Sequence, residues 1–261
     1  KLIGAEVAKS IVDDTVGYNL RKGNKYNQAF LDAGDRLVAV LSGQEDPGPP
    51  INASTINKWL GSFYTNPAPV GGIAAITARY PKLLSSDSNE VVKEFGEVLS
   101  DYNPQLGINN CLYLETSDAI LRTKSRKNPI YQFEFADANA PVCNVSIGSP
   151  CPPFNLGAVH SAELNYLFPN LSFTSKIDAP DLAVASQKLA NQMVAYWSNF
   201  VNTGTPNGPG LPEWPQYAGA KTPYGGSSVM LLEPANVKPY NSDNQHSCTA
   251  FWKKQYPSKL Q

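Results

Sequence analysis

The feature that most constrains this fold is a short continuous apolar run at residues 37–43, Leu-Val-Ala-Val-Leu-Ser-Gly. A strand buried on both faces of a parallel sheet has such a sequence, whereas a strand with one solvated face alternates between apolar and polar residues. The segment 44–48, Gln-Glu-Asp-Pro-Gly, follows the run directly. Because open α/β sheets place their functional loops at the carboxyl ends of strands, we expect an α/β fold with Glu45 and Asp46 in such a loop.

Helical patterns dominate the rest of the chain. The expected elements are helices over residues 52–63, 73–79, 88–102, 111–127 and 182–200, a strand at 130–135, a last short strand at 229–232 and a terminal helix opening at 245–253. The segment at 52–55, Asn-Ala-Ser-Thr, can cap the first of these helices. The helix at 182–200 should have about six turns, because apolar residues recur along it at helical spacing: Leu182, Ala185, Leu189, Met193, Trp197 and Phe200.

Composition excludes several classes of function. The charge is nearly balanced, with 21 basic and 22 acidic residues, so nothing favours binding to nucleic acid or to an anionic membrane. No run of about eighteen apolar residues predicts a membrane span. The 42% of apolar residues, with thirteen Tyr, ten Phe and four Trp, indicate a packed core and argue against a disordered chain.

Four cysteines and three Asn-x-Ser sequons, at Asn52, Asn144 and Asn170, favour a secreted, disulfide-permissive setting. Cys143 and Cys151 are only eight residues apart, which suits a local disulfide of roughly 2–3 kcal/mol. A metal site there is disfavoured, because no paired His or Cys accompanies them. Residues 1–10 lack the apolar core of a signal peptide, so we expect a processed chain or part of a longer precursor.

One of the two histidines, His160, lies in a loop beyond the strand at 130–135. An imidazole with a pKa near 6.5 can transfer a proton at neutral pH, although a lone histidine is more often structural. Its surroundings at residues 157–168 read Gly-Ala-Val-His-Ser-Ala-Glu-Leu-Asn-Tyr-Leu-Phe. This segment resembles the histidine motif of the type-B carboxylesterases, the cholinesterase-like branch of the α/β-hydrolases.

Further motifs carry the same resemblance in the same order: Asn-Pro-Ile-Tyr-Gln-Phe-Glu-Phe at 128–135, Ala-Tyr-Trp-Ser-Asn-Phe with Thr-Gly-Thr-Pro-Asn over 195–207, Trp-Pro-Gln-Tyr at 214–217, and Cys-Thr-Ala-Phe-Trp at 248–252. The resemblance runs from about residue 37 to the C-terminus. It implies that residues 1–261 are the C-terminal portion of one α/β-hydrolase domain, with the last strands of the central sheet and the surrounding helices. The implied activity is carboxylic-ester hydrolysis on a small-molecule or lipid ester, without a cofactor.

The resemblance also implies residue roles. His160 matches the base of the serine–histidine–glutamate triad, and Glu163 matches a carboxylate that supports it. Proline stands where an Asp-x-Gly match would place the acid, which leaves Glu45, the favoured residue, or Asp46. An acidic turn before Pro-Gly is the structural alternative. Cys111 and Cys248 match a disulfide of the cholinesterase branch, which leaves Cys143 to pair with Cys151, and His246 is expected to be a surface residue.

The nucleophile of this chemistry is missing. The sequence contains no Gly-x-Ser-x-Gly and no His-Gly-Gly segment for an oxyanion hole. In the family both precede the motifs quoted above. We therefore expect a serine-bearing N-terminal chain or segment as partner, and no activity from this chain alone. The alternative is a non-catalytic cholinesterase-like adhesion or binding protein, a class in which triad residues are commonly lost.

Overall fold

The computed structural model describes residues 4–16, 19, 21, 32–33, 36, 50–123, 128–141, 157–168, 182–219 and 228–257. The chain splits into two compact units, residues 1–107 and 108–261. Several sequence predictions lie outside the described residues: the strand at 37–43, the loop with Glu45 and Asp46, the pair Cys143 and Cys151, and the sequons at Asn144 and Asn170.

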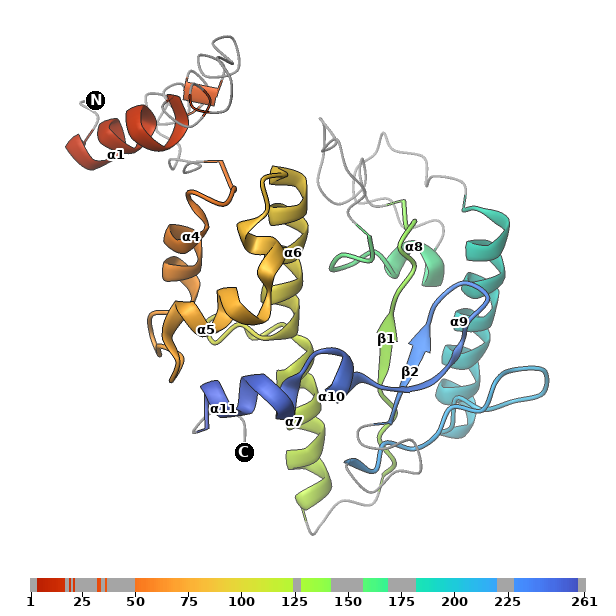
Figure 1. Ribbon diagram of the computed structural model, residues 1–261. Coiled ribbons are helices and arrows are strands. Elements are labelled where there is room, and N and C mark those ends of the chain that lie inside the picture. Colours follow the sequence, from red (N-terminus) through yellow and green to blue (C-terminus); the bar gives the residue numbers. More distant parts are fainter. Residues whose placement is uncertain are drawn as a thin grey trace. The chain divides into compact units, whose positions relative to one another are not determined.

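The described part of the first unit is helical (Figure 1). It contains α1 (Ala5–Ser10), a π-helical turn at Ile11–Val16, α4 (Ile56–Phe63), α5 (Gly72–Arg79), a 3-10 turn at Pro81–Leu84 and α6 (Ser88–Asp101). Helix α6 begins where it does because the Asp87 carboxylate accepts the backbone N–H of Asn89, which satisfies a donor of the first turn. The predicted helices at 73–79 and 88–102 are thereby confirmed. The first predicted helix is present but shorter: α4 begins at Ile56 after Thr55, and the Asn52 side-chain oxygen accepts the Ser54 N–H instead of capping the helix.

The apolar stripe of α6 forms the core of this unit. Val91, Phe95 and Val98 are buried, and the Phe95 ring lies 5.9 Å from the ring of Phe63 on α4, centroid to centroid. The Tyr64 hydroxyl, one residue past α4, donates to the carbonyl oxygen of Val98 at 3.1 Å. Burial of one amphipathic face, rather than helix propensity alone, therefore holds α4 and α6 together.

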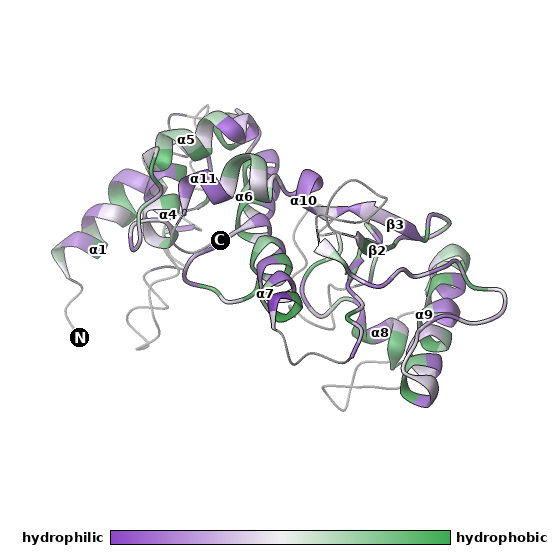
Figure 2. Cartoon of the chain, turned by 90° about the horizontal axis from the view of Figure 1, so that it is seen from below, coloured by the Kyte–Doolittle hydropathy of each residue, from purple (hydrophilic) through white to green (hydrophobic). Residues whose placement is uncertain are grey.

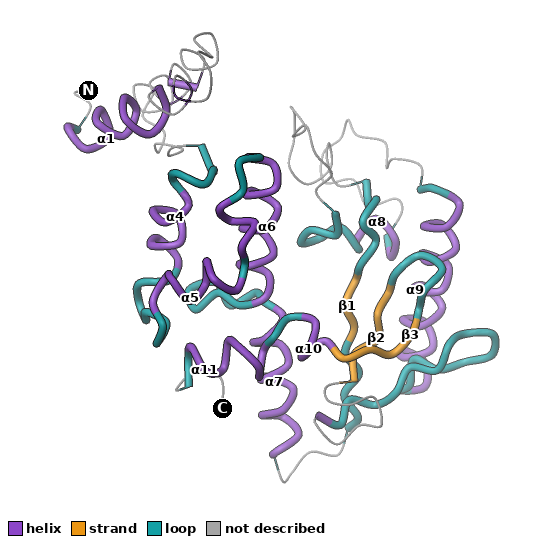
Figure 3. Tube along the Cα trace, viewed as in Figure 1, coloured by secondary structure: helices purple, strands orange, loops and turns teal. Residues whose placement is uncertain are grey.

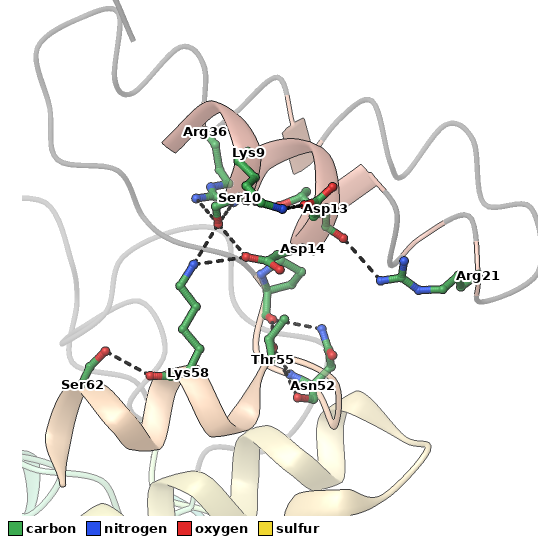
Figure 4. A network of polar contacts seen from close by, with 12 residues as sticks. Lys9, Ser10, Asp13, Asp14, Arg21, Arg36, Asn52, Thr55, Lys58 and Ser62 are labelled. Atoms are coloured by element: carbon green, nitrogen blue, oxygen red, sulfur yellow. Dashed lines mark hydrogen bonds and ion pairs between the residues drawn. The ribbon is translucent and has the colours of Figure 1, made fainter. Parts of the chain in front are cut away.

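A polar network joins the first helical segment to α4 (Figure 4). Lys58 Nζ donates to Ser10 Oγ at 3.0 Å and to Asp14 Oδ2 at 3.1 Å, and the buried Arg36 guanidinium donates to the Ser10 hydroxyl as well. Burial of the Asp14 carboxyl acts to raise its pKa. Hydrogen bonds from Ser10 and Lys58, with the charges of Lys58 and Arg36, outweigh that effect, so the pKa of Asp14 is lowered.

The second unit combines helices with a small mixed sheet (Figure 3). Its elements are α7 (Asn110–Arg122), β1 (Phe133–Phe135), α8 (Leu164–Leu167), α9 (Val184–Thr203), β2 (Ser228–Leu232), β3 (Lys238–Asn241), α10 (Ser242–Gln245), a π-helical turn at Cys248–Trp252, and α11 (Lys253–Gln255). The strand order is β1-β2-β3. Strand β1 is parallel to β2, with Phe133 opposite Met230, and β2 is antiparallel to β3. The crossover between the parallel strands carries α8 and α9, as an α/β fold requires.

The core of the second unit lies between α9 and the sheet. Leu189, Met193 and Tyr196 of α9 are buried in one cluster with Met230 and Leu232 of β2. Figure 2 shows apolar and polar residues mixed along α9, as expected for a helix with one face in the core. The predicted helix at 182–200 is therefore confirmed, and it ends at Gly204, whose φ of 77° is the left-handed conformation that glycine adopts without strain.

Trp214 is the centre of the aromatic packing in this unit. Its ring lies 5.2 Å from the ring of Tyr196, 5.8 Å from that of Trp197 and 6.1 Å from that of Phe133. Its indole N–H donates to the carbonyl oxygen of Gln132 at 3.0 Å. A single buried side chain thus joins α9 to the segment that enters β1, and it satisfies its own polar atom while doing so.

Three elements differ from the sequence expectation. Helix α7 ends at Arg122 rather than at Lys127, because Thr123 already has an extended ψ of 114°. The strand at 229–232 is not the last one: β3 follows it and pairs with it, although Pro239 lacks an N–H for the ladder. The expected continuous terminal helix is interrupted at Ser247, whose φ of 53° lies in the left-handed region.

Candidate active site

His160 lies in an exposed turn that precedes α8. Gly157, with φ 68°, and Ser161, with φ 69°, place the turn in conformations that glycine adopts freely but serine rarely does. Such a non-glycine residue costs of order 1–3 kcal/mol, and these residues cluster at functional sites. The His160 Nδ1 atom is 2.7 Å from the hydroxyl oxygen of Ser161. The imidazole is thus accessible, and one of its nitrogens has a polar partner.

The turn is tied to its own helix by backbone hydrogen bonds. Ala162 N–H donates to the Val159 carbonyl oxygen at 3.0 Å, Leu164 N–H to that of Ser161 at 3.3 Å, and Tyr166 N–H to that of Glu163 at 3.0 Å. Ala162 is fully buried in the core of the second unit. These hydrogen bonds and the buried Ala162 therefore fix the backbone around His160, while the imidazole is exposed to solvent.

The expected carboxylate partners of His160 have different outcomes. Glu163 is half-buried at the start of α8, and no hydrogen bond or ion pair joins its side chain to His160 among the described residues. Glu45 and Asp46 lie outside those residues. The roles of all three in a triad therefore stay predictions.

Asp137 was not singled out by the sequence, yet it is the most connected carboxylate near this turn. It follows β1, is 1% exposed, and its Oδ2 accepts hydrogen bonds from the Tyr166 hydroxyl at 2.6 Å and from the Ser186 hydroxyl. Its Oδ1 accepts the N–H of Asn139 at 2.8 Å. The only sequence signal was an aspartate two residues past a strand, because its partners come from α8 and α9.

His246 is not the surface residue that the sequence suggested. It is 8% exposed, and its Nε2 is 2.9 Å from Oε2 of Glu134 on β1. Its Nδ1 is 3.4 Å from Nδ2 of Asn110, and the Tyr240 hydroxyl donates to the same Glu134 oxygen. Glu134 is 112 positions away in the sequence, so no local spacing could reveal the pair. The second histidine is therefore a buried residue with polar partners on both ring nitrogens.

Cys111 and Cys248 form a disulfide, with sulfur atoms 2.01 Å apart, in the pairing that the resemblance implied. Asn52 is only 2% exposed, and its amide nitrogen donates to the Pro50 carbonyl oxygen at 3.0 Å. A glycan needs exposed space around that nitrogen, so burial makes this sequon poorly accessible, and its glycosylation stays a prediction.

Among the described segments, no group of three or more His, Cys, Asp or Glu side chains is placed to hold a metal ion. Over the same segments, no helix has the length and apolar content needed to cross a membrane.

Comparisons with known proteins agree with this architecture. The model of the carboxylesterase family matches residues 52–247, which is more than half of the chain. Human cocaine esterase is 29% identical over 133 residues, which cover 51% of this chain and 21% of that protein. Carboxylesterase 5A of Canis lupus familiaris is 36% identical over 91 residues, which cover 34% of this chain and 15% of that protein.

Among solved structures, an esterase from Clostridium hathewayi that can hydrolyse aliphatic aromatic polyesters covers 97% of this chain and 53% of its own, at 14% identity and a TM-score of 0.33. Similarity at that level carries no argument about fold. The matched segments span about a fifth or less of the two carboxylesterase relatives described above. The assignment rests on the family model, and by that match the chain belongs to the carboxylesterase family and forms part of an α/β-hydrolase fold.

Proposed function

We propose that this chain supplies the general base, and the acid that orients it, to a carboxylic-ester hydrolase. One observation carries the proposal: the family match spans residues 52–247 and includes His160, which lies exposed on a constrained turn beyond β1. An accessible imidazole on a rigid support is what a general base requires.

In the proposed reaction, a serine hydroxyl attacks the ester carbonyl while His160 Nε2 removes its proton. The imidazolium then returns that proton to the leaving alcohol, and backbone amides stabilise the oxyanion. Glu45, or Asp46 in its place, would accept a hydrogen bond from His160 Nδ1. The Ser161 hydroxyl lies against that nitrogen in the structure, so the proposal requires this hydroxyl to rotate away when the carboxylate binds. Glu163 would support the turn from the position just before the following helix, α8.

The serine and the oxyanion amides would come from a separate chain or segment that precedes this one in the enzyme. The sequence has neither a Gly-x-Ser-x-Gly elbow nor a His-Gly-Gly segment, which supports this division. Residues 1–261 would then complete a single α/β-hydrolase domain from its C-terminal side. By itself, the chain would not hydrolyse esters.

The substrate class follows from the family rather than from the described residues. We place it among carboxylic esters of small molecules or lipids, without a cofactor. The Cys111–Cys248 disulfide and the sequons at Asn144 and Asn170 support a secreted glycoprotein. Glycopeptide mapping of natively secreted protein tests this point: bare asparagines at both sequons would argue against it.

The test of catalysis uses this chain together with a serine-bearing segment and a nitrophenyl ester. His160→Ala should reduce turnover on the order of a millionfold, and Glu45→Gln by about ten-thousandfold, as for the base and the acid of comparable triads. Glu213→Gln is the control for loss of a carboxylate, because Glu213 is exposed and lies in the same unit as His160. An unchanged rate in His160→Ala would overturn the proposal. A loss in Asp46→Asn but not in Glu45→Gln would move the acid role to Asp46.

One feature favours a second function, that of a non-catalytic cholinesterase-like binding protein. Pro47 stands where an Asp-x-Gly match would place the acid. Under this alternative, the same assay would give equal and negligible rates for the unchanged protein and for His160→Ala, and a serine-directed organophosphate would label neither.

A further inference from the structure

We propose that Asp137 is the positioning residue for His160, because its buried carboxylate holds the start of the following helix against the end of β1. The inference rests on the proposed function only for what His160 does in the reaction. The positioning itself is argued from contacts within the second unit.

Asp137 lies where the end of β1 meets helices α8 and α9. Ala136 N–H donates to the Leu232 carbonyl oxygen at 3.0 Å, which extends the pairing of β1 with β2 up to Asp137. The carboxylate then accepts hydrogen bonds from Tyr166 on α8 and from Ser186 on α9. One side chain therefore links the end of the strand to both helices of the crossover.

Ring packing and backbone hydrogen bonds connect Asp137 to the turn that carries His160. The Tyr166 ring packs edge-to-face on Phe135, with centroids 4.7 Å apart, so both its ring and its hydroxyl are fixed by residues at the end of β1. Tyr166 N–H is bonded to the Glu163 carbonyl oxygen, and Leu164 N–H to that of Ser161, next to His160. The turn has no flexible linker between the anchored tyrosine and the imidazole.

The donors around Asp137 explain why a carboxylate occupies this buried position. Among the described residues, its hydrogen-bond donors are two hydroxyls and one backbone N–H, without a cation. An apolar side chain could fill the same volume, but it would not fix the directions of three donors. Burial, together with the hydrogen bond to Asp137, raises the pKa of Tyr166. The Tyr166 phenol therefore stays protonated, and keeps donating its hydrogen bond to Asp137, over the pH range in which ester hydrolases work.

The test exploits the fact that the chain has only two histidines. The 261-residue chain is labelled with carbon-13 histidine, and the two ring signals are compared by NMR at one fixed pH. His160→Gln assigns the His160 signal by its disappearance. The buried His246, bonded to Glu134, serves as an internal reference for the fold of the second unit.

Asp137→Asn should shift the His160 ring signal while leaving the His246 signal in place. An amide cannot accept from all three donors, because its NH₂ group is itself a donor. Asp101→Asn is the matched control: Asp101 is also buried and also accepts a tyrosine hydroxyl, that of Tyr80, at 2.6 Å, but in the first unit. It should leave the His160 signal unchanged.

Tyr166→Phe is the second variant, for the case in which Asp137→Asn does not fold. It keeps the ring and removes only the hydroxyl, and it should shift the His160 signal in the same direction. If the His160 ring signal in either folded variant equals that of the control, the proposal is overturned. The signal reports the setting of His160 whether or not this residue is a base. If His160→Ala is inactive but the His160 signal does not move in Asp137→Asn, only the positioning is refuted. If the signal moves in Asp137→Asn but His160→Ala keeps full esterase activity, only the proposed function is refuted.

Discussion

The Cys111–Cys248 disulfide should contribute more to the stability of the second unit than any other single feature. It closes a loop of 137 residues that contains all three described strands and α9. In the chain-entropy model, a loop of that length restricts the unfolded chain by ~5 kcal/mol. Whole domains are stable by roughly 5–15 kcal/mol, so replacing both cysteines by alanine should remove much of that stability. Both sulfurs are buried, which adds a small packing loss to the entropic one.

The assay is urea unfolding followed by tryptophan fluorescence in a Trp59→Phe background. The remaining tryptophans, Trp197, Trp214 and Trp252, all belong to the second unit. The double alanine variant should unfold at a much lower urea concentration, and its m-value should rise because the unfolded chain without the cross-link exposes more surface. The control is the unchanged protein with its disulfide intact.

A loss below about 1 kcal/mol would refute the reasoning, because the entropic term would then be absent. An unchanged m-value with a large loss would point to a folded-state effect, such as lost packing around Cys248. The two results can be told apart within one set of unfolding curves.

Three further predictions follow from the packing and the charges. Trp214→Ala should destabilise the second unit by about 3–5 kcal/mol in the same urea assay, because it empties the centre of the aromatic cluster and removes one of the two hydrogen bonds to the Gln132 carbonyl oxygen; a loss below about 1 kcal/mol would contradict it. Gly204→Ala should cost about 1 kcal/mol, since alanine is strained at φ 77°; an unchanged thermal midpoint would refute this. Asp14 has a lowered pKa in the folded chain, so its stabilising effect is present above the unfolded value of about 3.9 and is lost as the pH falls through the folded pKa. Lys58→Met should therefore cost at most about 1 kcal/mol at pH 6 and less at pH 3, measured by Trp59 fluorescence; a larger loss at pH 3 would reverse the sign.

Local signals explain which parts of the fold could be predicted. Helices α5, α6 and α9 have sharp sequence boundaries, namely the Tyr-Pro pair after α5, the Asp87 cap and Gly204. Strand β3 was missed because Pro239 is unusual in a strand, and the neighbouring pairing with β2 overrides that preference. The helix predicted at 111–127 was longer than α7 because residues 123–127 contain no strong helix-stop signal.

The candidate site shows the same difference between local signals and contacts made by distant elements. His160 could be found because its motif is contiguous in the sequence. His246 was misjudged and Asp137 was missed because their partners come from distant elements, Glu134 on β1 in the first case and α8 and α9 in the second. Contacts of that kind depend on the completed fold, and no spacing along one segment encodes them.

The central claim is that this carboxylesterase-family chain carries the base of the reaction but not its nucleophile. The most direct measurement treats the chromatographically pure 261-residue chain with a serine-directed organophosphate and with a short-chain nitrophenyl ester. The account predicts no stoichiometric label and the same residual turnover for the unchanged chain and for His160→Ala, since loss of the nucleophile costs on the order of a millionfold. Stoichiometric labelling of a serine within these residues, with turnover well above that of His160→Ala, would contradict it.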